Sequence, residues 1–225
     1  MKLSFLMAFL PRSVFVLFLM APTCSNAQLD EIPKLYAGLG YYRHTSFDDD
    51  SYYHVRVGAQ ILSYKFVSPE IDFTYYFGGN ERVVRSDLET GFPTSVVFRV
   101  FRGLIWGAAL KLFYGDEDLR LVVIPKYHFG KVTSEGLLST SANNRIPKKN
   151  AMAILNYWSF SIGMEGVLNA ERFKIGAYLV YTGFDAGRAM NQIEFPSEGF
   201  TGSSIETSTL GLNVRVLYSL WKVEK

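Results

Sequence analysis

Apolar and polar residues alternate with a period of two along most of this chain, a pattern typical of β-strands rather than helices. Between Tyr53 and Ser63, one face is apolar and the other is polar or glycine: Val55, Val57, Ala59 and Ile61 against His54, Arg56, Gly58 and Gln60. The same alternation covers residues 67–77, 157–168 and 206–220, and less regularly 34–42, 95–114, 119–131 and 172–184. The pattern predicts eight strands, most of them about 9 to 15 residues long.

The predicted strands have the length and the connections of a membrane-spanning barrel. A tilted strand crosses a bilayer in roughly 9–11 residues, whereas a helix needs about 20 apolar residues. The longest uncharged, mostly apolar run after residue 28 is 103–110, which is too short for such a helix. We expect the long segment 95–114 to project beyond the bilayer or to bend near Arg102 and Gly103. Short turns at 63–66, 115–118 and 169–171 alternate with long loops at 78–94, 132–153 and 185–204, as in outer-membrane barrels.

Charged residues fall on the face opposite the apolar one, and this decides which face points toward lipid. The charges on this face are Arg56, Glu70, Asp72, Lys111, Lys126, Glu165, Lys174 and Arg215. A lysine or arginine facing lipid near the midplane costs about 2–4 kcal/mol, whereas inside a barrel these groups can pair with one another. Glycines such as Gly38, Gly163 and Gly211 share this face and leave room for long neighbours. We therefore predict an all-β, transmembrane, antiparallel up-and-down barrel whose lumen holds a charge network.

Composition agrees with this placement. Aromatic residues make up 16% of the chain, yet its mean hydropathy is only +0.09. Many aromatic residues fall near predicted strand ends, where rings form belts at the two membrane surfaces. The residues assigned to these belts are Tyr41, Tyr42, Tyr52, Tyr53, Phe66, Tyr75, Phe77, Tyr114, Tyr127, Phe129, Trp158, Phe173, Tyr181, Phe184 and Tyr218.

The first 27 residues have the features of a cleaved signal peptide. Lys2 and Arg12 precede an apolar run, and Ser25-Asn26-Ala27 supplies a small-x-small cleavage site. Residues 28–225 then form a single barrel domain. Lipidation of Cys24 is the alternative processing route. Cleavage removes two of the 23 basic residues and none of the 21 acidic ones, so the mature chain is neutral and no nucleic-acid partner is expected.

The last predicted strand carries the most specific resemblance to a known family. Its sequence from Thr209 to Tyr218 is TLGLNVRVLY, with a polar residue, a glycine, and then alternating apolar residues ending on an aromatic. This strand is similar to the C-terminal signal read by the barrel-assembly machinery, and residues 34–220 resemble the small eight-stranded outer-membrane barrels of the OmpA/OmpX-like superfamily. The resemblance implies an integral protein of the cell outer membrane, inserted by that machinery, but no single activity.

Candidate catalytic and ligand-binding residues are few. His44, His54 and His128 are the chain's histidines, and a lipid-facing His–Ser pair near one rim would indicate an envelope-lipid hydrolase. The run Asp48-Asp49-Asp50 lacks the spaced pattern of a calcium loop. Arg145, Lys148 and Lys149 give a predicted loop a basic patch able to contact lipopolysaccharide phosphates. No catalytic, cofactor or metal site is assigned.

The sequence therefore predicts a non-enzymatic barrel with a structural or interaction role. Its expected surroundings are outer-membrane lipid and lipopolysaccharide. A protein partner would bind through the long loops, because loops on a rigid scaffold commonly carry such contacts, and the chain would act as an accessory subunit of an envelope complex. A narrow pore or transporter of small solutes is the alternative, since the inward charges could line an ion path. An envelope-lipid hydrolase is the third hypothesis.

Overall fold

The structure is a computed structural model that describes residues 33–44, 51–116, 118–140, 147–168, 172–201 and 209–220. The predicted leader at 1–27, Cys24, the run Asp48–Asp50 and Arg145 lie outside these residues. Among the described residues, no helix is both long and apolar enough to cross a membrane.

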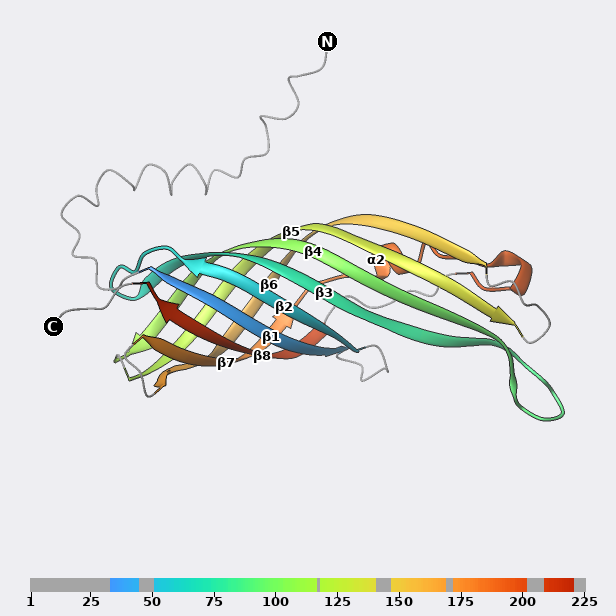
Figure 1. The fold of residues 1–225 in the computed structure, drawn as a ribbon, viewed down its shortest axis with the longest axis horizontal. Coiled ribbons are helices and arrows are strands. Elements are labelled where there is room, and N and C mark those ends of the chain that lie inside the picture. Colours follow the sequence, from blue (N-terminus) through green and yellow to red (C-terminus); the bar gives the residue numbers. More distant parts are fainter. Residues whose placement is uncertain are drawn as a thin grey trace, which may run out of the picture.

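Eight antiparallel strands pair in chain order, and the last strand closes the ring against the first (Figure 1). The strands are β1 (Lys34–His44), β2 (Ser51–Gln60), β3 (Val67–Ser86), β4 (Pro93–Gly115), β5 (Leu119–Thr140), β6 (Lys148–Leu168), β7 (Phe173–Thr182) and β8 (Thr209–Ser219). The predicted up-and-down barrel is confirmed. Closure leaves β1 and β8 paired along their whole length, which removes the exposed edges of an open sheet.

The register of the strands sets the tilt of the barrel. A row of paired residues that starts at Lys34 passes once around the ring and returns to β1 at His44, ten residues further on. With 3.3 Å per residue and 4.8 Å between strands, this shear tilts the strands by about 41°. Each residue then rises about 2.5 Å along the barrel axis. A ring of this size has an interior just wide enough for side chains.

The outward face of the ring is apolar, and the inward face is polar. Leu39, Trp106 and Leu212 are more than half exposed, whereas inward residues such as Arg56 and Glu70 are buried. Outward aromatic pairs lie near both ends of the strands, with ring centroids 5.2 Å apart for Tyr41–Tyr53 and 5.1 Å apart for Phe173–Tyr218. The arrangement is that of a membrane barrel, in which the apolar face contacts lipid.

Four neighbouring strands are about twice as long as the other four. β3, β4, β5 and β6 have 20, 23, 22 and 21 residues, whereas β1, β2, β7 and β8 have 10 or 11. The long strands project past one rim as a four-stranded sheet, which extends to the right in Figure 1. We call this projecting part the blade: residues 79–86, 93–102, 132–140 and 148–154.

The blade corrects two of the predicted loops. Most of 78–94 and 132–153 is strand, joined by a short hairpin at 87–92 in the first case. The prediction failed because these segments mix glycine, polar and apolar residues on both faces, so their period of two is weak. The expectation that 95–114 projects beyond the barrel agrees with the structure, because β4 pairs with β5 on both sides of Arg102.

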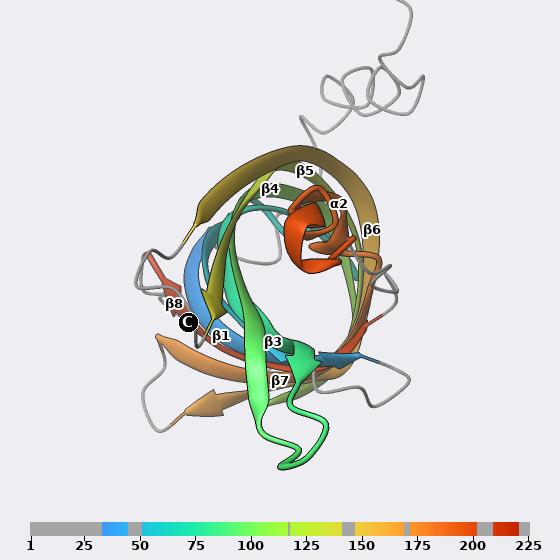
Figure 2. The ribbon, with the colours of Figure 1, turned by 90° about the vertical axis from the view of Figure 1, so that its right-hand side faces the viewer.

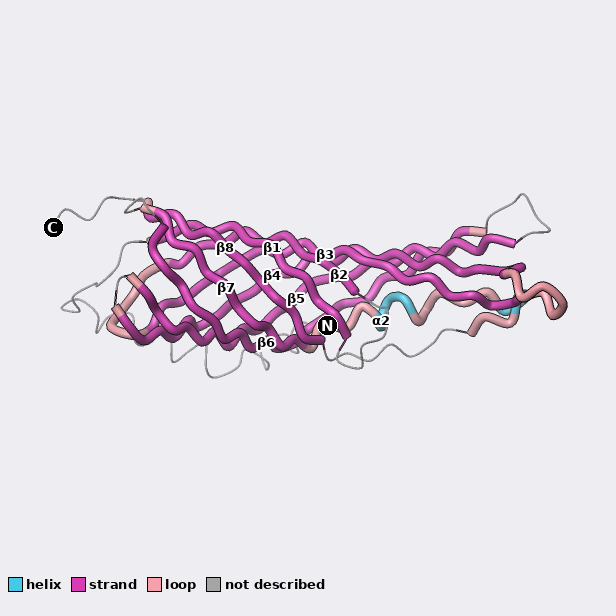
Figure 3. Tube along the Cα trace, turned by 90° about the horizontal axis from the view of Figure 1, so that it is seen from below, coloured by secondary structure: helices cyan, strands magenta, loops and turns pink. Residues whose placement is uncertain are grey.

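The connection between β7 and β8 turns back along the inner side of the blade. We call residues 183–201 the return segment; it contains α2 (Gly187–Met190) and the 3-10 helix η2 (Pro196–Glu198). Viewed along the barrel, α2 lies within the outline of the ring, beside β4, β5 and β6 (Figure 2). Figure 3 shows the return segment running beside the projecting strands. The segment gives the blade an apolar core: Ile193, Phe195 and Phe200 pack on Val97 and Leu138.

Aspartates close two of the exposed turns. Asp87 accepts hydrogen bonds from the backbone of Thr90 and Glu89 and from the Thr90 hydroxyl, and these bonds lower the pKa of Asp87 below the ordinary 3.8. Asp116 accepts hydrogen bonds from the backbone N–H groups of Leu119 and Asp118, and these bonds also lower the pKa of Asp116. Both turns therefore hold their shape most firmly when the aspartates are ionised.

Candidate functional site: the filled lumen

A first group of charges joins strands on opposite sides of the lumen. Arg215 on β8 donates to Glu70 on β3 and to Glu165 on β6, both at 2.9 Å. Lys111 on β4 lies 2.6 Å from Glu165 and 3.9 Å from Glu70. These strands are not neighbours in the ring, apart from β3 and β4, so the side chains cross the lumen rather than line it.

A second group surrounds Asp72 on β3. Lys126 forms an ion pair with the Asp72 carboxylate, and Arg56 lies 3.7 Å from it. The Tyr36 hydroxyl donates to the same carboxylate at 3.0 Å, and the Thr74 hydroxyl donates to it at 3.3 Å. The Asp72 carboxylate thereby contacts side chains from β1, β2, β3 and β5, so it links four of the eight strands.

Arg215 belongs to the first group and also contacts Tyr36 of the second group through its aromatic ring. The centre of its guanidinium is 4.9 Å from the Tyr36 ring and 4.4 Å from the Tyr178 ring. The Tyr178 hydroxyl accepts a hydrogen bond from Arg215 at 2.6 Å and donates one to Glu165. Cation–π contacts of this kind are strongest where water is excluded, and all of these side chains are buried.

The structure brings together seven of the eight residues named in the predicted charge network. The seven residues are Arg56, Glu70, Asp72, Lys111, Lys126, Glu165 and Arg215. Lys174, the second residue of β7, lies on the inward side of the strand and is half-buried, and none of the contacts described above includes it. Four basic and three acidic groups leave a formal excess of one positive charge, which hydroxyl and amide oxygens such as those of Thr74 and Gln60 help to solvate.

An aromatic layer fills the lumen on the loop side of the charges. Phe184 of the return segment stacks on Tyr76 with ring centroids 4.3 Å apart, and Tyr42 stacks on Tyr52 at 4.9 Å. The Tyr157 hydroxyl donates to that of Tyr76 at 3.2 Å, from β6 to β3. The assignment of Tyr42, Tyr52 and Phe184 to membrane belts is wrong, because all three are buried inside the barrel. Position near a strand end did not reveal which way each ring points.

Two histidines lie in this layer. His128 Nε2 is 2.7 Å from the Ser159 hydroxyl, and its ring stacks on Tyr157. The Asn213 amide donates to His54 Nε2 at 3.0 Å. The other ring nitrogen of each histidine has no hydrogen-bond partner among the described residues. A His–Ser contact therefore exists that the sequence pattern did not reveal, but it faces the lumen rather than lipid and lacks the orienting group of a catalytic triad.

The remaining candidates do not form a site. Within the described ranges, no three His, Cys, Asp or Glu residues are grouped so as to hold a metal ion. Lys148 and Lys149 lie in β6 and not in a loop, which corrects their placement. Lys148 pairs with Glu135 at 2.7 Å, and Lys149 lies 5.5 Å from the centre of the Phe195 ring.

Several solved structures are similar to this chain over most of its length. It is similar to Neisserial surface protein A, with 8% identity, a TM-score of 0.47, and 84% of this chain and 96% of that chain covered. It is also similar to a major outer membrane protein from Thermus thermophilus, with 11% identity, a TM-score of 0.46, and 83% of this chain and 98% of that chain covered. The attachment invasion locus protein Ail of Yersinia pestis matches with 9% identity, a TM-score of 0.38, and 84% and 98% coverage. No family model and no curated protein matches the sequence. At these identities and with TM-scores below 0.5, the likenesses carry no conclusion about function.

Proposed function

We propose that the protein is a non-enzymatic, non-conducting barrel of the outer membrane that anchors the blade for contact with a protein partner. The observation that carries the proposal is the blade itself. Its four strands continue the barrel strands, with an irregularity in the β3–β4 pairing only near the tip, between Val83 and Ser86, and the return segment packs on its inner side. A sheet built in this way is rigid, so it can hold a binding surface at a fixed height above the membrane.

The filled lumen supports an anchoring role over conduction. Ion pairs such as Arg215–Glu70 and Lys111–Glu165 cross the space through which ions would pass. Above them, Phe184 packs between Tyr76 and Tyr157. Opening a path would require these buried side chains to separate and to exchange their present partners across the lumen for water. A pore remains the alternative hypothesis, but no described contact favours it.

The outer side of the blade offers a surface for a partner. Phe98 and Val100 on β4 are 39% and 45% exposed, and Val83 on β3 is 51% exposed. Met152 and Ile154 on β6 extend this apolar surface toward the membrane. Exposed apolar residues on a soluble projection commonly mark a binding surface. Charged neighbours such as Glu81 border the apolar residues, as at the polar rim of an interface.

Site-specific photo-crosslinking in intact outer membranes tests this proposal. A photoreactive side chain replaces Phe98 on the blade, and a matched chain carries it at Phe160, which is 49% exposed on the lipid-facing surface of the same barrel. We expect a discrete protein adduct from position 98 and lipid adducts alone from position 160. The proposed blade interaction would be refuted if position 98 gave no protein adduct beyond that seen at position 160.

A further inference from the structure

Three of the described strands, β1, β4 and β5, carry a basic residue at one border of their lipid-facing surface. At the other border no described strand carries one, and the exposed basic residues Lys65 and Arg172 lie in turns. On β4, the outward residues from Tyr114 to Leu104 are uncharged, and the next one is Arg102. On β5, those from Leu119 to Phe129 are uncharged, and the next one is Lys131. Arg43 follows the outward residues of β1 in the same way. All three basic residues are exposed and lie on the blade side of the barrel.

The position of these residues matches the edge of a bilayer. Ten residues separate Tyr114 from Leu104, and at about 2.5 Å per residue they span about 25 Å, the height of an outward apolar band. Arg102 and Lys131 therefore lie where the hydrocarbon ends and lipid headgroups begin. Arginine and lysine at this depth face the phosphate groups of headgroups, with which they form charge-assisted hydrogen bonds.

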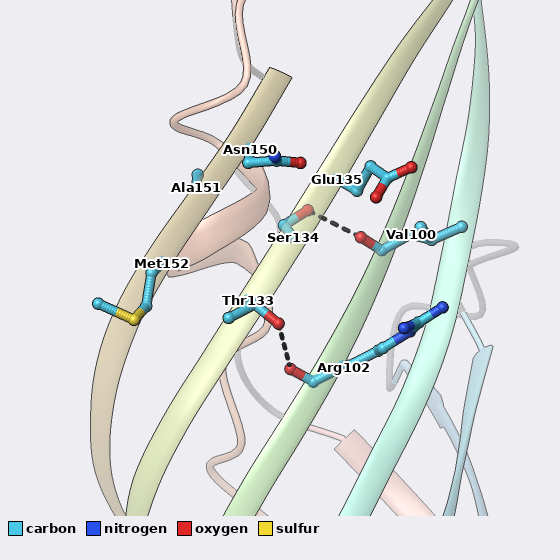
Figure 4. Close-up of a pocket in the computed structure, with 8 residues that line it drawn as sticks. All are labelled: Val100, Arg102, Thr133, Ser134, Glu135, Asn150, Ala151 and Met152. Atoms are coloured by element: carbon cyan, nitrogen blue, oxygen red, sulfur yellow. Dashed lines mark hydrogen bonds between the residues drawn. The ribbon is translucent and has the colours of Figure 1, made fainter. Parts of the chain in front are cut away.

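The register lets the long side chains of Arg102 and Lys131 reach one anion together once the Arg102 side chain, which extends toward β3 in Figure 4, turns toward β5. Arg102 pairs with Thr133, and Leu104 pairs with Lys131, so the two basic side chains are diagonal neighbours on the outward face. Diagonal neighbours have Cβ atoms about 7–8 Å apart, which long side chains can bridge. No ion pair joins either side chain to an acidic group in the part of the chain that the structure describes. The nearby Glu135 is already held by Lys148.

A pocket lies on the blade side of Lys131, and Arg102 lines it. It has a volume of about 480 Å³ and is bordered by β4, β5 and β6, within the range of about 300–1,000 Å³ usual for small-molecule sites. Figure 4 shows Thr133, Glu135 and Asn150 around it, on adjoining strands. Their hydroxyl, carboxylate and amide groups suit a polyhydroxylated ligand. The strands are held in place there by the Thr133 and Ser134 hydroxyls, which donate to the Arg102 and Val100 carbonyls at 3.3 and 3.0 Å.

We propose that this surface binds a membrane glycolipid whose sugar headgroup carries phosphate. The phosphate lies between Arg102 and Lys131, and the sugar occupies the pocket against Thr133 and Asn150. The inference rests on the proposed insertion of the barrel in a membrane but not on a protein partner. Failure of the crosslinking experiment at Phe98 would leave it standing, and failure to bind glycolipid would leave the blade interaction standing.

The test is titration of the full mature protein in neutral detergent, with bound lipid counted by native mass spectrometry. The probes are a bis-phosphorylated diglucosamine lipid, its dephosphorylated form, phosphatidylglycerol, and inorganic phosphate as a soluble competitor. We expect the phosphorylated glycolipid to bind about tenfold more tightly than its dephosphorylated form. We also expect it to bind more tightly than phosphatidylglycerol, and inorganic phosphate to compete weakly.

Substitutions assign the binding to the named residues. R102Q/K131Q should remove the preference for the phosphorylated form, and the charge-conserving R102K/K131R should retain it. The matched control is R85Q/R188Q, which removes two exposed charges on the same side of the membrane, 58% and 62% exposed. Equal affinity for the two glycolipid forms, or an unchanged preference in R102Q/K131Q, would overturn the proposal. Equal affinity for phosphatidylglycerol would overturn the role of the pocket, and strong competition by inorganic phosphate would identify a free anion as the ligand.

Discussion

Glu165→Gln removes the acid that holds two cations in the lumen. The Glu165 carboxylate lies 2.6 Å from Lys111 Nζ and 2.9 Å from a terminal guanidinium nitrogen of Arg215, and it also accepts a hydrogen bond from Tyr178. The substitution keeps the shape of the side chain but leaves two cations to share Glu70. Breaking a buried pair in this way costs about 3–5 kcal/mol. Glutamine still accepts one hydrogen bond, so we expect a loss of about 3 kcal/mol in the free energy of unfolding.

The assay is reversible unfolding in urea from phospholipid vesicles, followed by tryptophan fluorescence. With a slope of about 2 kcal/mol/M, the expected loss lowers the unfolding midpoint by about 1.5 M. Glu135→Gln is the matched control, because Glu135 pairs with Lys148 at a similar 2.7 Å but is 38% exposed. An exposed pair contributes only about 0–1 kcal/mol. Equal midpoints for the two variants would refute the claim that burial makes the lumen network strong.

A double-mutant cycle with Arg215→Met checks that the effect belongs to the pair. If Glu165 and Arg215 act through each other, the double variant should lose less free energy than the sum of the single losses, by about 0.5–3 kcal/mol. Additive losses would show that each residue acts through other contacts.

Two further predictions concern a glycine and a turn. In Gly211→Ala, the new Cβ would lie 2.6 Å from the Tyr41 backbone oxygen and would collide with the Tyr42 ring, so the free energy of unfolding measured in urea should fall by about 1–3 kcal/mol. The control is Gly183→Ala, whose Cβ would meet nothing closer than 3.5 Å and which should be tolerated. Equal losses in the two variants would contradict the described packing. In Asp87→Ala, the Thr90 amide should lose protection from hydrogen exchange at neutral pH. Because the pKa of Asp87 is lowered below 3.8, the protection of this amide in the wild type and in the variant should become equal as the pH falls through that lowered pKa. A difference in protection that persists in strong acid would contradict the role of the ionised carboxylate.

The sequence revealed the barrel because one physical rule governs most of the chain. Every strand that crosses the membrane must be apolar outside, and its lumen side can be polar. Arg56, Asp72 and Arg215 therefore appear at positions that alternate with Val57, Phe73 and Val216. The same rule placed the charges inside without any knowledge of their partners. Pairings across the ring, such as Arg215–Glu70, could not be predicted, because they depend on the shear.

The alternation of faces correctly places two tyrosines inside the barrel, whereas their position near strand ends wrongly indicated membrane belts. Tyr42 and Tyr52 fall on the inward face with Gly40 and His54, yet their place near strand ends suggested membrane belts. The alternation of faces is the stronger signal, because a one-residue shift turns a side chain from lipid to lumen. Phe184 differs, because it follows the end of β7 and is placed by the return segment.

The blade and the return segment could not be predicted from the sequence for a different reason. Outside the bilayer no rule forces one face to be apolar, so β3 beyond Gly78 and β5 beyond Val132 show no clean alternation. These strands are stabilised by each other and by Ile193, Phe195 and Phe200, which are distant in sequence. The His128–Ser159 contact is likewise a cross-strand neighbour pair that no short motif reveals.

Single-channel recording in a planar bilayer tests most directly the central claim that the lumen is filled. The purified full-length protein is inserted and held at increasing voltage, with the E165Q variant as a comparison. The ion pairs and the aromatic layer described above predict no steady openings for the wild-type protein. Reproducible, ion-selective openings of the wild-type protein would contradict the account and favour a pore.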